Sequence, residues 1–171
     1  QDRVDRVEKV WHSFVKNQEQ GRLPDTWNPR QRNIGIFCSS DDEFVAIGEA
    51  WKNEIYPNQV TAIHRIAHDL HKSNPEIQLY LRVHPNLASV DNERKTSMLS
   101  LQSPNLTIIA PDADIDTYKL MKSCEKIATF GSSVGSEAVY WGIPSVLLGP
   151  CLYQGLGGIY RANSHEDTLN L

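Results

Sequence analysis

The residues best suited to chemistry form segment 129–137, which has the sequence TFGSSVGSE. It follows a β-rich run and precedes residues with helical spacing, so it predicts a turn that opens a helix. Ser132, Ser133 and Ser136 supply hydroxyl groups, and Gly135 lets the backbone approach a ligand closely. The first helical turn adds N–H groups without backbone partners at the positive end of the helix dipole. Such a turn is suited to binding a phosphate.

The same segment has a plainer interpretation, in which Ser132 or Ser133 caps the helix while a later Glu reaches back to the cap. Capping and phosphate binding are compatible. The segment lacks the Gly-Lys-Ser/Thr of a P-loop and the spacing of a dinucleotide-binding turn, which disfavours ATP chemistry and NAD. Glu137 lies one turn inside the helix, where it could accept hydrogen bonds from a ribose diol or be an ordinary first-turn acid.

A second group of candidates, Arg82 and His84, lies at the end of another β-rich run. Pro85 cannot extend a central strand and restricts His84 to an extended conformation, which holds the imidazole where the strand ends. A histidine held there can donate to a phosphate oxygen, and strand alternation puts Arg82 on the same face. Alternatively, His84 only ends the sheet and Arg82 pairs with an acid. We treat both as candidate catalytic residues.

Three further residues are weaker candidates for the same site. Ser39 and Ser40 follow a short apolar run and precede acids 41–43, so their backbone N–H groups could meet an anion. The alternative is a helix start enriched in Asp and Glu. Tyr118 could stack near a base or simply fill the rim of the site.

No metal site is expected. The alternating aspartates in 112–116 lack the Gly and the distal Glu of a calcium loop, so they are expected to cap a helix. The three histidines in 64–71 flank an apolar stripe, which indicates an exposed polar face. The three cysteines are an odd number without a C-x-x-C pair, which favours neither a disulfide framework nor zinc and fits a reducing compartment.

Strands that alternate with helices would position these residues. The predicted strands are 34–38, 77–83, 106–109, 126–130 and 145–148. Helices are predicted through Trp51, around 60–70, and at 92–101, 116–123 and 133–141. This alternation indicates an α/β, Rossmann-like parallel sheet with helices on both faces. Ligands bind such sheets at the C-terminal strand ends, where the strand order reverses, so the polar loops should share one edge.

Size and charge restrict the possible functions. The chain has 171 residues, enough for one ordinary domain, and its net charge of -4 argues against a broad surface for nucleic acid. No apolar run is long enough to cross a bilayer. Residues 4–14 have the spacing of an amphipathic helix, and 17–32 have the composition of an irregular linker. We expect residues 1–32 to precede a domain at 33–171, within a longer protein.

The motifs taken together resemble the C-terminal domain of GT-B glycosyltransferases, and within these the capsular polysaccharide biosynthesis group. The resemblance covers roughly residues 33–160 and rests on SSDDEF after the first strand, RVHPNL, DTY at 116–118, and FGSSVGSEA followed by YWGIP. In related enzymes with cytidine-linked donors, a His-Pro motif and a paired-Ser motif contact the donor phosphate. By resemblance this points to His84, Ser132 and Ser133.

The resemblance implies that residues 33–171 are the nucleotide-sugar-binding half of a glycosyltransferase. The implied reaction moves a sugar from a CMP- or UDP-linked donor to a growing surface or capsular polysaccharide, with no cofactor or required metal. A glycan or lipid-linked acceptor would bind through an N-terminal domain that this chain lacks. A cytoplasmic location follows, compatible with peripheral association with a membrane assembly at the inner face of the plasma membrane. The alternatives are a nucleotide-sugar 2-epimerase, a noncatalytic nucleotide-binding module, and a domain that binds nothing.

Overall fold

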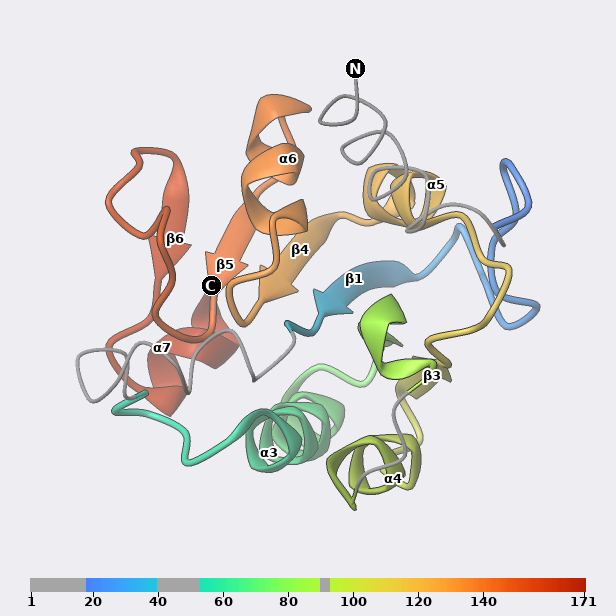
Figure 1. Ribbon diagram of the computed structural model, residues 1–171. Helices are drawn as coiled ribbons and strands as arrows, with labels where there is room; N and C mark the ends of the chain where they lie inside the picture. The colour runs from blue at the N-terminus through green and yellow to red at the C-terminus, as the bar shows by residue number, and fades with distance from the viewer. Residues whose placement is uncertain (1–17, 40–52, 90–92) are drawn as a thin grey trace.

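A six-stranded parallel sheet forms the centre of the computed structural model, which describes residues 18–39, 53–89 and 93–171 (Figure 1). Its strand order is β3-β2-β1-β4-β5-β6, and all five ladders are parallel. The α/β, Rossmann-like fold predicted from the sequence is therefore confirmed. The strands are β1 (Arg32–Phe37), β2 (Ile77–Arg82), β3 (Leu106–Ile109), β4 (Lys126–Thr129), β5 (Ser145–Leu147) and β6 (Ile159–Arg161).

Helices cover both faces of the sheet (Figure 1). One face carries α3 (Gln59–Ser73), α4 (Glu93–Leu99) and α7 (His165–Asn170), and the other carries α5 (Thr117–Ser123) and α6 (Val134–Tyr140). Each face has its own buried hydrophobic cluster. Within the described ranges, no helix is both long and apolar enough to cross a membrane.

Helix α3 shows how the sequence encodes these elements. Asn58 caps its first turn by accepting from the Thr61 N–H at 2.8 Å, and the helix ends at Ser73, two residues before Pro75. Its buried stripe recurs at helical spacing, whereas His64 and His68 are exposed, as the sequence predicts. The predicted helices at 4–14 and through Trp51 lie outside the described residues.

Two short elements are absent from the sequence-based prediction. Strand β6 has only three residues, mostly exposed, and one neighbouring strand, so it has no alternating pattern that reveals it. A 3-10 turn, η2 (Pro85–Leu87), follows β2. The other predicted strands and the helices near 60–70, 92–101, 116–123 and 133–141 are present, with ends that differ by a few residues.

The segment before β1 is irregular, as predicted, and packs against the α5 face. The rings of Trp27 and Tyr80 lie 4.8 Å apart, and the Tyr80 hydroxyl donates to the Thr26 carbonyl at 3.0 Å. The Gly21 N–H donates to the Asp116 carboxylate at 2.8 Å. These contacts cover part of the sheet face that α5 and α6 leave open.

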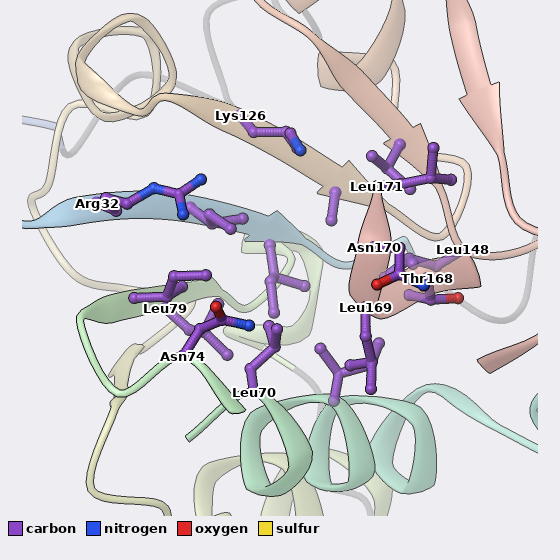
Figure 2. Close-up of a pocket in the computed structure, with 16 residues that line it drawn as sticks. Arg32, Leu70, Asn74, Leu79, Lys126, Leu148, Thr168, Leu169, Asn170 and Leu171 are labelled. Atoms are coloured by element: carbon purple, nitrogen blue, oxygen red, sulfur yellow. The ribbon is translucent and has the colours of Figure 1, made fainter. Parts of the chain in front are cut away.

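A cavity of about 260 Å³ lies on the opposite face, between the sheet and the helices α3 and α7. Figure 2 shows Leu70 of α3 and Leu169 of α7 projecting into the space beneath the strands. Arg32 and Lys126 line it at the N-terminal ends of β1 and β4. The cavity therefore follows the face of the sheet and is distinct from its C-terminal edge.

His165 anchors α7 to α3 by bridging two side chains. Its Nδ1 lies 2.8 Å from the Tyr56 hydroxyl, and its Nε2 lies 3.0 Å from an Asp69 carboxylate oxygen. The other Asp69 oxygen lies 2.8 Å from Nδ1 of His68. Hydrogen bonds from His68 and then from His165 hold the pKa of Asp69 below its ordinary value.

Asp69→Ala should lower the melting temperature at pH 7 by about 2–4 °C, the effect of losing one hydrogen-bonded bridge in a domain of this size. Because the folded-state pKa of Asp69 is depressed, its stabilisation is complete above the unfolded value of about 3.9 and is lost as pH falls through the folded value. The difference between wild type and variant should therefore shrink towards pH 3. Thermal unfolding monitored by circular dichroism at several pH values tests this.

Glu54→Ala is the control, because Glu54 is exposed and forms no ion pair within the described residues. Equal melting temperatures for wild type and Asp69→Ala at pH 7, or a difference that grows towards pH 3, would contradict the assignment.

Candidate functional site

The candidate site lies along the C-terminal edge of the sheet. The ladder register places Phe37 opposite both Arg82 and Thr129, and Arg82 opposite Ile109. The polar loops after these four strands therefore leave the sheet from one row. The strand order reverses between β1 and β4, which is where open parallel sheets bind ligands.

The serine turn, defined here as Gly131–Ser133, joins β4 to α6. Gly131 has φ of 105°, a left-handed conformation that favours glycine. Ser133 is the residue before the first helical turn, yet its side chain forms no capping hydrogen bond, and the residue is exposed. The capping box considered as an alternative is therefore absent from this turn.

Hydrogen bonds fix the orientation of the peptide groups in the serine turn. The Gly135 N–H donates to the Ser132 carbonyl at 3.0 Å, and the Ser136 N–H and hydroxyl both donate to the Ser133 carbonyl. In a trans peptide the N–H points opposite to the preceding carbonyl, so the N–H groups of Ser133 and Val134 point towards the turn and away from the helix. Neither finds a protein acceptor among the described residues. Two directed donors thus lie where an anion could bind.

Tyr153, from the loop after β5, fastens this turn. Its hydroxyl donates to the Ser132 carbonyl at 2.5 Å and lies 3.1 Å from the Thr129 hydroxyl. A Cβ added to Gly135 would lie 2.6 Å from the Tyr153 hydroxyl and 2.9 Å from Oγ1 of Thr129. The space beside Gly135, expected from the sequence to admit a ligand, is therefore occupied by protein side chains.

Ser39 connects the loops on either side of the strand-order reversal. Its hydroxyl donates to the Phe130 carbonyl at 3.0 Å, and its N–H donates to the Gln59 side chain at 3.3 Å. Only 2% of Ser39 is exposed. Ser39 thus supports the start of the serine turn from within the fold. Ser40 lies outside the described residues.

Arg82 holds the loop that follows β3. The residue is 3% exposed, and its guanidinium donates to the Ala110 and Ala113 carbonyls at 2.5 and 3.2 Å. The alternative in which Arg82 pairs with an acid does not hold within the described residues, where its guanidinium binds backbone carbonyls. Burial lowers the pKa of Arg82, and the nearby charge of Asp112 opposes that shift.

His84 is extended, as Pro85 requires, with φ of -60° and ψ of 129°. Its Nδ1 accepts a hydrogen bond from the Asn86 N–H at 3.2 Å. Burial, and then the positive charge of Arg82, lower the pKa of His84 and favour the neutral ring. A neutral imidazole that accepts through Nδ1 carries its proton on Nε2, so His84 can act as a hydrogen-bond donor through that atom.

Tyr118 and Glu137 come together although they belong to α5 and α6. Burial, together with the negative charge of Glu137, raises the pKa of Tyr118, and 39% of Tyr118 is exposed. Both residues lie on the helix-covered face next to the serine turn. Among the residues that the structure describes, no group of three or more His, Cys, Asp or Glu side chains is placed to hold a metal ion.

Three residues hold the backbone of the site in place and were not identified from the sequence, namely Thr129, Gln59 and Tyr153. Tyr153 precedes a Gly-rich segment, and its contact with Ser132 spans 21 residues. Gln59 reaches Ser39 across 20 residues. Nothing local in the sequence reveals contacts of this kind.

Comparisons with known proteins come from sequence and from structure. A sequence profile of the family described as capsule polysaccharide biosynthesis protein matches residues 25–169. No curated protein sequence matches the chain. The fold is similar to a solved structure described as Thermosulfurimonas dismutans KpsC, beta Kdo 2,4 transferase, with a TM-score of 0.57 and 15% identity over 95% of this chain and 49% of that one.

Two other solved structures share the fold. One is described as Thermosulfurimonas dismutans KpsC, beta Kdo 2,7 transferase, with a TM-score of 0.50 and 16% identity over 94% of this chain and 46% of that one. The other is a UDP-GlcNAc 2-epimerase from Neisseria meningitidis bound to UDP-GlcNAc, with a TM-score of 0.50 and 14% identity over 98% and 39%. The chain spans about half the length of the two transferases that it matches.

Gly135→Ala should lower the free energy of unfolding by about 1–3 kcal/mol, because a methyl group must displace the Tyr153 and Thr129 hydroxyls in a packed site. Urea denaturation followed by fluorescence measures the change. Gly155→Ala is the matched control, since its Cβ would have no neighbour within 4 Å, and it should stay within about 0.5 kcal/mol of wild type. Equal stability of the two variants would contradict the packing role of Gly135.

Proposed function

Because the chain belongs to the family of capsule polysaccharide biosynthesis proteins, we propose that it is the donor-binding domain of a glycosyltransferase. The enzyme transfers a sugar from a CMP- or UDP-linked donor to a growing surface or capsular polysaccharide. The glycan or lipid-linked acceptor binds outside this domain, and the reaction takes place in the cytoplasm, at the inner face of the plasma membrane.

One observation carries the proposal, which is that donors from two strand ends share the edge where the strand order reverses. The N–H groups of Ser133 and Val134 have no acceptor among the described residues, and the neutral ring of His84 carries a donor on Nε2. These groups suit a phosphate, because hydrogen bonds from fixed dipoles to a charged oxygen are stronger than neutral ones. They need no metal.

In this proposal the same donors assist the reaction. When the bond between the sugar and the donor phosphate breaks, negative charge builds on the leaving phosphate. Donors already aimed at that phosphate stabilise the transition state more than the ground state. His84 and the hydroxyl and N–H groups of Ser132 and Ser133 have this role, while buried Arg82 positions the neighbouring loop.

The other candidate residues have supporting roles in the proposed site. Glu137 accepts from the ribose hydroxyls, and Tyr118, which lies beside it, stacks near the base. Ser136 and Gly135 belong to the first turn of α6 and maintain its backbone. Ser39 supports the serine turn through its hydrogen bond to the Phe130 carbonyl.

Two alternative functions keep this fold. A nucleotide-sugar 2-epimerase would interconvert UDP-N-acetylglucosamine and its epimer without any glycan acceptor. A noncatalytic module would bind a nucleotide while the native protein shows no donor turnover. An assay of the native protein with donor, with and without acceptor, separates these alternatives from the transferase.

His84→Ala and Ser133→Ala should each weaken binding of the preferred nucleotide by about 1–3 kcal/mol, the effect of one lost charge-assisted hydrogen bond. A thermal-shift panel of CMP, CDP, UDP and GDP first identifies that nucleotide, and titration calorimetry then measures its affinity. His64→Ala and Ser100→Ala are the controls, because both residues are exposed away from the strand-end edge, His64 on α3 and Ser100 directly after α4.

The control variants should bind the nucleotide as wild type does. Unchanged affinity in His84→Ala and Ser133→Ala would refute the site assignment. If no nucleotide in the panel raises the melting temperature, the donor-binding function itself is wrong.

A further inference from the structure

The side chain of Tyr153 reaches from the loop after β5 to the serine turn. Its hydroxyl lies 2.5 Å from the Ser132 carbonyl and 3.1 Å from the Thr129 hydroxyl. Thr129 is fully buried at the end of β4, and its Oγ1 accepts from the Gly131 N–H at 3.5 Å. Three hydrogen bonds, all formed by the Thr129 and Tyr153 hydroxyls, therefore connect both ends of the Gly131–Ser132 dipeptide to the end of β4.

The direction of each hydrogen bond follows from the chemistry of the partners. A carbonyl only accepts, so the Tyr153 hydroxyl must donate its single proton to Ser132. Tyr153 can then only accept from Thr129, whose hydroxyl must donate to it. Oγ1 of Thr129 remains an acceptor for the Gly131 N–H. The bonds form one directed chain from the Gly131 N–H through Thr129 and Tyr153 to the Ser132 carbonyl.

This chain fixes the orientation of the peptide that joins Ser132 to Ser133. Because the two dipoles of a trans peptide are antiparallel, a carbonyl held by Tyr153 makes the Ser133 N–H point the opposite way. That N–H has no acceptor among the described residues. We propose that Tyr153 is a positioning residue that aims the Ser133 N–H at the donor phosphate, an inference that rests on the proposed donor-binding function.

The surroundings of Tyr153 support this role. Burial raises the pKa of its hydroxyl, so the group stays protonated and remains a donor at neutral pH. The hydroxyl approaches the Gly135 backbone so closely that a side chain there would displace it, so glycine at this position admits the ring. The ring comes from a different strand end than the turn it holds, so donor binding depends on the loop after β5 as well as on β4.

Tyr153→Phe tests the proposal, because it removes the hydroxyl and keeps the ring. Binding of CMP and of UDP is measured by calorimetry on the whole chain, and the amide signal of Ser133 is followed by NMR during the same titrations. We expect the affinity to fall about fivefold to tenfold, the effect of one hydrogen bond. We also expect the shift of the Ser133 amide signal at saturation to shrink, which a general loss of stability would not produce.

Thr129 supplies an independent pair of variants. Thr129→Val removes the hydroxyl and keeps the shape, whereas Thr129→Ser keeps the hydroxyl. Thr129→Val should weaken binding in the same direction as Tyr153→Phe, and Thr129→Ser should bind as wild type does. Because the two hydroxyls act in one chain, the double variant Tyr153→Phe with Thr129→Val should lose little more than Tyr153→Phe alone.

Tyr160→Phe is the matched control, since Tyr160 is 53% exposed on β6, and it should leave binding unchanged. If wild type binds CMP or UDP and Tyr153→Phe binds it equally well with the same Ser133 amide shift, the positioning role is wrong and the donor-binding function stands. If wild type binds neither nucleotide, the proposed function fails and this inference fails with it.

Discussion

The parallel register of the central strands is the constraint on which the candidate site depends. Pairing of Phe37 with both Arg82 and Thr129 aligns the ends of β1, β2 and β4, so three polar loops begin at one level. The hydrogen bond from Ser39 to the Phe130 carbonyl then joins the loops across the reversal in strand order. A shift of one residue in the β1–β2 ladder would turn Arg82 to the other face of the sheet, and the same shift in the β1–β4 ladder would turn Thr129.

The candidate site consists of backbone N–H groups and one neutral imidazole, without exposed cations among the residues described for it. Arg82, a buried cation, is held by two backbone carbonyls, and its charge adds to the effect of burial in lowering the pKa of His84. The Ser133 and Val134 N–H groups are oriented by the carbonyls that precede them. Such an arrangement is suited to a locally bound anion in a chain of net charge -4, since it requires no basic surface.

Residues that hold the site come from distant parts of the chain. Gln59 supports Ser39, Tyr153 supports Ser132, and the guanidinium of Arg82 supports the loop after β3. Each of these side chains forms a hydrogen bond with a backbone group. Gly135 must lack a side chain because the Tyr153 hydroxyl occupies the space beside it. The geometry of the turn is therefore a property of the whole strand-end edge.

The sequence by itself determined the fold class, the family and the members of the serine turn, because alternation of strands and helices and the order of motifs are local patterns. It also determined that His84 is extended, since Pro85 acts on its immediate neighbour. Only the tertiary structure decided that Gly135 accommodates Tyr153, that Ser39 is used within the fold, and that Arg82 binds carbonyls instead of an acid. These contacts join residues 18 or more positions apart, and a local sequence pattern contains no information on which distant side chain fills a given space.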